Sequence, residues 1–435
     1  MNEFLYPFVM ETIELLHSGL KTKAGNKSIE ILNFVLDAPA RTGIKKVKHI
    51  NGYLGCDICL AEGEFIENRM TFPNLDAPLR NDNDYRERNY DEYHHDESML
   101  EQLPMDMIRS FPLDDLHCLY LGVMKRILGH FKNTKKSLSV ADWKQIEMRI
   151  VDYASTQPVE YQRRLRSFAE MGNFKGTEFR QYLLVVAPVL LKGIIGEDKI
   201  KNLIMLQIAS IIFTHGRFKA FYQQADILMR QFLNDFSICY GPRHLTYVFH
   251  GLCHLKVFTD LYGPLTKFST FAYESENYSI KQMLRGPKLP VVQVANRILE
   301  KYQAPKTVES HVNKTIIQEN ITHSTFNRLQ YCGLKFIADK KGQNWMLLKG
   351  SRFAKFIQVH NANNETKVEV KVVEHISSLY DTINTLRFNI VKIKKSFFPS
   401  MMIELAEIDG KLWELNLDQA NYFALFPIYI EDAKN

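Results

Sequence analysis

Residues 245–277 read LTYVFHGLCHLKVFTDLYGPLTKFSTFAYESEN, and the interpretation of the whole chain depends on this stretch. It holds two histidines four positions apart, His250 and His254. Helical spacing of four places both imidazoles on one face, one turn apart, where they can supply half of a tetrahedral zinc site. A Gly-Pro break follows at residues 263–264, and the acidic residue Glu274 then lies in an aromatic setting.

The other half of such a site occurs far upstream, at Cys56 and Cys59 of a CxxC motif. Glycines flank this motif, and turn residues on both sides suit a zinc knuckle, in which the chain bends sharply to bring two thiolates to one metal. Two incidental buried thiols are the alternative interpretation of a single CxxC. If the CxxC and the HxxxH meet, they clasp together two segments that are distant in the sequence.

The composition sets broad limits on the class of protein. The chain has 435 residues, of which 46% are hydrophobic, so two or three domains with substantial cores are expected. A formal charge of +6 permits a nucleic-acid partner without requiring one. Six cysteines in so long a chain favour a reducing compartment over a disulfide framework. No apolar run reaches membrane-spanning length, so no membrane association is expected.

The N-terminal segment contains a candidate acidic residue. An amphipathic helix is expected over residues 4–20 and a buried strand over residues 29–36. Asp37 follows this strand and is closely followed by Pro39, a placement that can present a carboxylate to a site. The alternative is that Asp37 caps the next helix.

Residues 64–103 are polar and are expected to form an exposed, partly flexible segment. The helix expected next, over residues 111–128, has Asp114 at its N-terminus, a position that favours carboxylates. His117 lies in the first turn, so either Asp114 and His117 act together chemically or they are a cap and a buried histidine. Further helices are expected as far as Tyr240, and Arg180, at the start of one of them, can contact a phosphate or pair with a nearby acid.

The C-terminal part has a different texture. Short β-rich runs separated by turns predict a small all-β barrel or sandwich over residues 331–435, and residues 303–330 are predicted to be a linker. Two groups of lysines either contribute to a basic surface or are simply solvated. These groups are Lys45, Lys46 and Lys48, and Lys392, Lys394 and Lys395.

Four motifs follow one another along the first part of the chain. They are Asp-Ala-Pro-Ala-Arg at 37–41, Gly-Tyr-x-Gly-Cys-x-x-Cys at 52–59, Phe-Pro-Leu-Asp-x-Leu-His-x-x-x-Leu-Gly-Val at 111–123, and the run from His-x-x-x-His-Leu to Phe-Ser-x-Phe-x-x-Glu at 250–274. With these motifs in this order, roughly the first 300 residues resemble the CACTA-type DDE transposases. More distantly, the sequence is similar to the catalytic subunit of the V(D)J recombinase.

The resemblance implies an RNase H-like fold on which three acids hold two Mg²⁺ or Mn²⁺ ions for strand cleavage and transfer. Asp37 corresponds to the second acid of the family and Glu274 to the third. A family motif of unassigned role corresponds to Asp114 and His117. The family's structural zinc site, which brackets a helical insertion, corresponds to Cys56, Cys59, His250 and His254. The resemblance also implies a DNA partner and a nuclear location, and it allows a homo-oligomer.

The first acid of the family pattern has no counterpart in this sequence. The upstream acids lie in helical or loop texture rather than at the end of a buried strand; they are Glu3, Glu11, Glu14 and Glu30. We therefore expect the C-terminal portion of a transposase, with no DNA cleavage or joining of its own. A non-enzymatic, zinc-stabilised module that binds DNA, chromatin or another protein is the alternative.

The expected fold class is accordingly α/β with two additions. A partial RNase H-like core consists of residues 1–63, which carry the CxxC, and residues 246–302, which carry the HxxxH and Glu274. A large all-α insertion occupies residues 64–245. A small all-β domain follows the linker.

Overall fold

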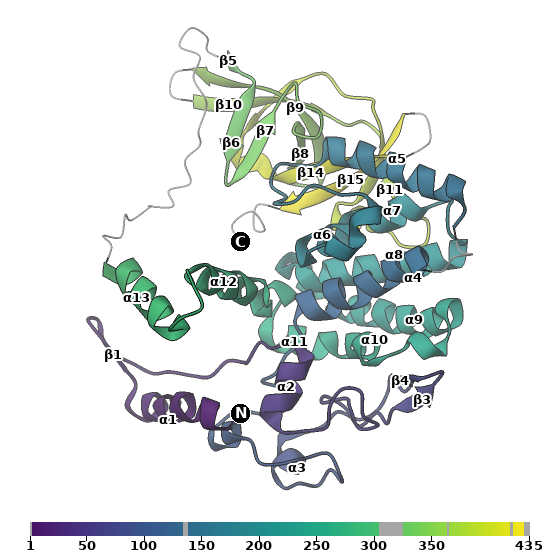
Figure 1. Cartoon of the computed structure of the whole chain (residues 1–435). Coiled ribbons are helices and arrows are strands. Elements are labelled where there is room, and N and C mark those ends of the chain that lie inside the picture. Colours follow the sequence, from purple (N-terminus) through teal and green to yellow (C-terminus); the bar gives the residue numbers. More distant parts are fainter. Residues whose placement is uncertain (1, 134–137, 304–324, 363–364, 418–420, 430–435) are drawn as a thin grey trace. The chain divides into compact units, whose positions relative to one another are not determined.

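The computed structural model describes residues 2–133, 138–303, 325–362, 365–417 and 421–429. The chain divides into two compact units (Figure 1). Unit 1 comprises Met1–Asn133, Tyr182–Leu184 and Gly196–Ile298, and unit 2 comprises Thr134–Gln181, Val185–Ile195 and Leu299–Asn435. The segment 64–245, predicted as one helical insertion, therefore contributes to both units.

Unit 1 is mainly helical. Helix α8 (Glu197–Thr214) is buried along nearly its whole length, as expected for a helix that is apolar on most sides. Helix α9 (Tyr222–Tyr240) packs beside it, where the Asn202 side-chain amide donates to the Phe232 carbonyl at 2.8 Å. The other α-helices described here are α1 (Asn2–Ser18), α2 (Ala38–Lys45), α3 (Asp82–Arg86), α4 (Lys125–Asn133), α10 (Tyr247–His250), α11 (Leu255–Tyr262), α12 (Phe271–Gln282) and α13 (Pro290–Gln303), the last of which runs past the end of unit 1.

The buried strand predicted for residues 29–36 is wrong. Residues 28–37 form no regular secondary structure. The run instead packs locally: the Phe34 amide donates to the Ser110 carbonyl at 2.8 Å, and the Phe34 ring stacks on Phe111 with centroids 5.5 Å apart. The strands described in unit 1 form two hairpins, β1 (Leu20–Thr22) with β2 (Gly25–Lys27) and β3 (Glu64–Ile66) with β4 (Arg69–Thr71).

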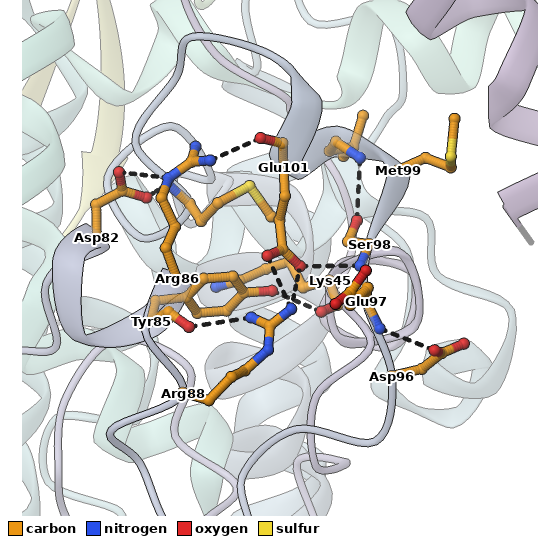
Figure 2. A network of polar contacts seen from close by, with 12 residues as sticks. Lys45, Asp82, Tyr85, Arg86, Arg88, Asp96, Glu97, Ser98, Met99 and Glu101 are labelled. Atoms are coloured by element: carbon orange, nitrogen blue, oxygen red, sulfur yellow. Dashed lines mark hydrogen bonds and ion pairs between the residues drawn. The ribbon is translucent and has the colours of Figure 1, made fainter.

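The polar segment 64–103 is held against unit 1 rather than being simply exposed. The Arg88 guanidinium pairs with Glu101 at 2.8 Å, and the Arg86 guanidinium donates to the Glu101 carbonyl at 2.6 Å (Figure 2). The Ser98 hydroxyl donates to the Ile44 carbonyl at 2.6 Å, which ties the segment to α2. The charged side chains, which suggested a solvated segment, therefore pair within the segment. Ser98 attaches the segment to α2.

Unit 2 is built on one antiparallel sheet with the strand order β11-β12-β15-β14-β8-β9-β10-β13, and β5 also pairs with β9. A separate hairpin, β6–β7, contributes Leu329, Leu334 and Phe336 to the core beneath this sheet. The strands are β5 (Thr325–Phe326), β6 (Arg328–Tyr331), β7 (Leu334–Ile337), β8 (Trp345–Leu348), β9 (Arg352–Ala362), β10 (Glu365–Val372), β11 (Ile376–Ser378), β12 (Val391–Lys394), β13 (Met401–Glu404), β14 (Ile408–Asn416) and β15 (Tyr422–Tyr429).

The predicted all-β character of the C-terminal region is confirmed. The linker predicted for residues 303–330 ends earlier than expected, because β5 and β6 lie within it. Of the remaining part of that linker, residues 304–324 lie outside the described residues.

The sheet of unit 2 also requires a helix from the middle of the chain. Helix α5 (Val140–Thr156) lies along β14: the Thr156 hydroxyl donates to the Glu414 carbonyl at 2.6 Å, and the Trp413 indole donates to the Tyr153 carbonyl at 3.3 Å (Figure 1). The short helices α6 (Gly176–Gln181) and α7 (Ala187–Leu191) belong to the same part of the chain. Residues 331–435 are therefore not a self-contained β domain, since α5 covers part of their sheet.

Gly342 offers a test of this packing. A β-carbon at Gly342 would lie 1.9 Å from the Thr156 carbonyl oxygen, and the residue has a φ of +74°. We expect Gly342→Ala to destabilise unit 2 by about 3 kcal/mol or more, because the left-handed backbone and the overlap each cost about 1–3 kcal/mol. Urea unfolding followed by tryptophan fluorescence measures the change.

Gly350→Ala is the matched control, since Gly350 has the same φ of +74° but no heavy atom within 4 Å of the added carbon. We expect it to cost only about 1–2 kcal/mol, the backbone contribution alone. Equal destabilisation by both substitutions would contradict the contact between Gly342 and α5.

Candidate metal centre and acidic cluster

Four buried side chains from two distant segments of unit 1 converge on one point. They are Cys56, Cys59, His250 and His254. The cysteines lie in the glycine-flanked loop between α2 and β3, and the histidines lie at the end of α10 and at the end of the following 3₁₀ turn. Their possible ligand atoms all lie within 4.8 Å of one another. The expected meeting of the CxxC and HxxxH motifs is therefore seen.

The size of this cluster suits a tetrahedral ion. The Cys56 and Cys59 sulfurs are 3.5 Å apart, and the two Nε2 atoms of His250 and His254 are 3.3 Å apart. The sulfur–nitrogen distances are 3.3 Å for Cys59 to His250 and 3.6 Å for Cys56 to His254. Tetrahedral bonds of zinc length give edges of about 3.8 Å for S–S, about 3.6 Å for S–N and about 3.3 Å for N–N. These four side chains can therefore hold a metal ion such as zinc.

The pKa values of the Cys56 and Cys59 thiols shift in opposite directions. Burial opposes ionisation of Cys56, but the hydrogen bond from Cys59 and the nearby His254 hold the pKa of Cys56 well below its usual range. The pKa of Cys59 is raised, because its thiol hydrogen-bonds to Cys56 and is itself buried. The pair thus stabilises one thiolate by itself. A bound cation would supply the charge that favours the second.

A buried ion pair fastens this loop to the rest of unit 1. Asp57, between the two cysteines, accepts from the Arg41 Nε at 2.7 Å and lies 3.3 Å from the Lys45 ammonium. The Tyr247 hydroxyl donates to Asp57 at 2.9 Å and also bonds to Arg41. Burial alone would raise the pKa of Asp57, yet Arg41 and Lys45 hold that pKa below its usual range. The Asp57 carboxylate is therefore charged. It connects the CxxC loop to Arg41 of the Asp-Ala-Pro-Ala-Arg motif and to Tyr247, just before the HxxxH.

The sequence predicts that Lys45, with Lys46 and Lys48, belongs to a basic surface or is simply solvated. For Lys45 both interpretations are wrong. Its side chain is 0% exposed, and burial lowers its pKa. It faces Asp57 and the ring of Phe111 instead of solvent, with its ammonium 5.2 Å from that ring's centroid. Arg41, Asp57 and Tyr247 were missed as a network, although their presence within or beside the motifs was the available signal.

Asp37 is the N-cap of α2. One of its carboxylate oxygens accepts from the Ala40 amide at 2.8 Å, as the capping alternative predicted. Asp37 nevertheless lies close enough to His117 to raise the pKa of that histidine. The residue is therefore both a cap and part of the surroundings of His117.

His117 is the centre of the acidic cluster. Its Nδ1 lies 3.1 Å from Asp114 Oδ1, and its Nε2 lies 3.9 Å from Glu274 Oε1. Asp114 also caps the helix by accepting from the His117 amide at 2.9 Å, and it accepts from the Thr270 hydroxyl at 2.5 Å. The capping role predicted for Asp114 is seen, but His117 is half-buried rather than buried, and joint chemical action of the two residues stays a prediction. Thr270 was missed, because nothing in its local sequence distinguishes it.

The electrostatics of the cluster favour a cationic imidazole. The hydrogen bond to Asp114 raises the pKa of His117, burial opposes this rise, and the charges of Asp114, Asp37 and Glu274 add to it. Glu274 therefore lies beside the His117 ring, and the charge of Asp37 acts on the same imidazole. A cavity of about 40 Å³ adjoins the site, with Arg41, Asp114 and His117 in its wall, and it has room for one or two water molecules.

His117 belongs to a π-helix, Leu116–Met124, which continues into α4. Gly122 makes this geometry possible, because a β-carbon there would lie 2.4 Å from the His117 carbonyl oxygen and 2.7 Å from a methyl group of Val248. Short π-helical segments are rare and are often found at functional sites. The Leu-Gly-Val motif therefore has a packing role beside the acidic cluster.

Arg180 lies in α6, which belongs to unit 2 rather than unit 1. The neighbouring acid Glu178 is bound by another arginine, since Arg166 Nε lies 2.6 Å from Glu178 Oε1. Arg180 and the acidic cluster therefore belong to different units.

The metal centre can be tested by elemental analysis of the purified chain. We expect one transition-metal ion per chain, and we expect Cys56→Ser or His254→Ala to lose it, because either change removes one of four converging ligands. Cys239→Ser and His95→Ala are controls that change the same residue types outside the cluster and should retain the metal. A metal content near zero in the parent chain would contradict the assignment.

The ion pair at Asp57 gives a second test. We expect Asp57→Asn to lower the free energy of unfolding by about 3–5 kcal/mol, because it leaves the Arg41 charge buried without its partner. Urea denaturation followed by circular dichroism measures this. Asp76→Asn is the control, since Asp76 is 91% exposed in its pair with Arg230 and should change stability little. Equal effects of the two changes would show that the Asp57 pair is dispensable.

Comparisons with known proteins identify no relative. No family model matches the sequence, and neither a curated protein nor a solved structure matches it significantly. Across the described residues, no helix has the length and apolar character needed to cross a membrane. The function must therefore be inferred from the chemistry of the two clusters.

Proposed function

We propose that this chain is a DNA-binding protein derived from a DDE transposase, in which zinc clasps the core and strand cleavage has been lost. One observation carries the proposal: motifs scattered between Asp37 and Glu274 meet in unit 1. The thiols meet the imidazoles, Glu274 lies beside His117, and the charge of Asp37 acts on the same histidine. Motifs that matched by chance would have no reason to converge in space.

Zinc is the ion that the Cys₂His₂ cluster favours. Thiolate and imidazole are borderline-soft donors that suit zinc, and hard ions such as Mg²⁺ prefer oxygen ligands. Four protein ligands leave no open position for substrate, so the role we assign to the ion is structural. Zinc would then hold the CxxC loop against the helical turn that carries His250 and His254.

The acids support a nucleic-acid site with reduced chemistry. In a two-metal mechanism, convergent carboxylates hold divalent ions that activate the attacking oxygen and stabilise the leaving one. Asp37 and Glu274 are the residues we assign to Mg²⁺ or Mn²⁺, on an incomplete RNase H-like core. Asp37 already accepts from the Ala40 amide, and Asp114 from Thr270. The only compact group of potential ligands found among the described residues is the Cys₂His₂ cluster. We therefore propose that the chain does not cleave DNA by itself.

A nuclear location and self-association during DNA binding belong to the same proposal, since both come from the resemblance to transposases. The alternative is a module that never used its acids and binds DNA, chromatin or a partner protein. The capping role of Asp37 favours this alternative, because it explains the residue without any chemistry. The two versions share the zinc clasp and differ in whether Glu274 has any part in the function.

DNA binding and nicking distinguish these versions. We expect the purified chain to bind a labelled duplex with an affinity that falls steeply with salt, and to leave supercoiled plasmid intact in Mg²⁺ or Mn²⁺. Asp37→Asn and Glu274→Gln should retain binding, because duplex affinity comes chiefly from phosphate contacts with basic residues. Fluorescence anisotropy and gel electrophoresis are the measurements.

Two results would overturn parts of this proposal. Absence of duplex binding at 50 mM salt would remove the DNA-binding function. Manganese-dependent nicking that disappears in Glu274→Gln would show that cleavage was retained, and the site would then be active rather than a remnant.

A further inference from the structure

A group of basic side chains gathers on unit 1 away from the lysine clusters visible in the sequence. We call it the basic cluster, and its members are Arg69, Arg126, His130, Lys199, Arg243 and His244. They come from β4, α4, α8 and the 3₁₀ turn Pro242–His244, which follows α9. Arg69 lies 3.4 Å from the His244 ring, measured between a guanidinium nitrogen and Nδ1. The His130 and His244 rings lie 5.5 Å apart.

The positions of these side chains are fixed by packing. The hairpin that carries Arg69 is anchored where the Phe72 amide donates to the Leu245 carbonyl at 2.8 Å. The His130 and Tyr240 rings pack together with their centroids 5.1 Å apart. The Lys199 ammonium also lies 5.1 Å from the centroid of the Tyr240 ring. The cluster is therefore a built surface rather than a chance gathering of mobile chains.

Positive charge exceeds negative charge in the cluster. Glu67 pairs with Arg243 at 2.8 Å, and Asp198 and Asp235 lie toward Cys239, beside Lys199. Burial lowers the pKa of His244, and the charges of Arg69, His130 and Arg243 lower it further. Partial burial of the Arg126 guanidinium lowers its pKa and Arg69 lowers it further, while the residue as a whole remains exposed. Arg69 and Arg126 are exposed at this surface, where both would attract a bound anion.

We propose that the basic cluster is the surface on which this protein binds the phosphate backbone of duplex DNA. The proposal rests on the DNA-binding function proposed above and adds its location. Arginines supply the exposed charge at Arg69 and Arg126, and the planar guanidinium matches phosphate oxygens in two-point hydrogen bonding. Phosphate contacts of this kind fix the position of the protein on a duplex without reading its sequence.

The cluster is rigidly connected to the acidic cluster. Arg126 lies nine positions after His117 on the continuous helical segment formed by the π-helix and α4. That separation is about 13 Å along a helix axis, or about four base pairs of duplex. Arg243 and His244 likewise precede Tyr247, which bonds to Asp57. A duplex on the basic cluster would thus be held at a fixed distance from Glu274 and His117.

The test uses the full chain and a fluorescein-labelled 25-base-pair duplex, titrated between 50 and 200 mM NaCl. We expect the triple variant Arg69→Ala, Arg126→Ala, Arg243→Ala to bind at least about tenfold more weakly at 100 mM salt. The slope of log affinity against log salt should become shallower by about 2–3, since each lost phosphate contact contributes about 0.9.

Two further variants separate charge from folding. The triple variant Arg69→Lys, Arg126→Lys, Arg243→Lys keeps the charge. Its slope of log affinity against log salt should be close to that of the parent. The triple variant Lys21→Ala, Lys23→Ala, Lys27→Ala removes the same amount of charge from the exposed β1–β2 hairpin. Its DNA affinity should stay within about twofold of that of the parent. Each variant must keep the parent's metal content and unfolding curve.

The outcomes distinguish the surface from the function. If the parent binds DNA but the arginine variant binds equally well, or if the hairpin variant is equally weakened, the assigned surface is wrong and the DNA-binding function stands. If the parent binds no duplex, the function itself fails. Binding to vesicles containing phosphatidylserine, with the same arginine dependence and no DNA binding, would assign the cluster to an anionic membrane instead.

Discussion

The buried carboxylate of Asp57 is the interaction on which unit 1 depends. It stands between the two cysteines of the CxxC, pairs with Arg41 from the Asp-Ala-Pro-Ala-Arg motif, and accepts from Tyr247 at the start of α10. A buried ion pair seldom adds much net stability, but removing one partner leaves a charge that nothing solvates. Such a pair favours one arrangement of the chain. The charges of Arg41 and Asp57 are fully paired only when α2, the CxxC loop and α10 come together. The metal cluster lies on this junction, so the ion pair and the proposed zinc hold the same elements together.

The acidic cluster is organised around a histidine rather than around an empty metal site. Asp114 fixes the His117 ring from one side, and Glu274 lies near its other nitrogen. The hydrogen bond to Asp114 and the charges of Asp37 and Glu274 raise the pKa of His117, and a protonated imidazole here would partly neutralise the charge that attracts a divalent ion. The proposed loss of cleavage therefore has a physical basis in the present charges, independent of how many acids a complete transposase would contain.

Sequence patterns predicted the metal centre well because its chemistry leaves a local mark. A CxxC and an HxxxH are visible as spacings, and their four side chains meet as expected. The β character of the C-terminal region was equally visible as alternating short runs. The strand predicted before Asp37 failed because an apolar run does not specify a strand, and Phe34 is only partly buried where it stacks on Phe111. The dependence of the sheet on α5 left no local mark, since Thr156 and Glu414 interact only after folding.

Charge was the least predictable property of the chain. Lys45 belongs to a run of lysines yet is fully buried against Asp57, whereas Arg69, Arg126 and Arg243 are far apart in the sequence and gather only in the folded unit. A run of like charges along a chain repels itself and is relieved by solvent or by a partner such as Asp57. Charges contributed by separate rigid elements cannot move apart in this way, because packing holds β4, α4 and the turn after α9 in place. Basic side chains that packing holds together on separate elements are therefore the basis of the proposed DNA-binding surface.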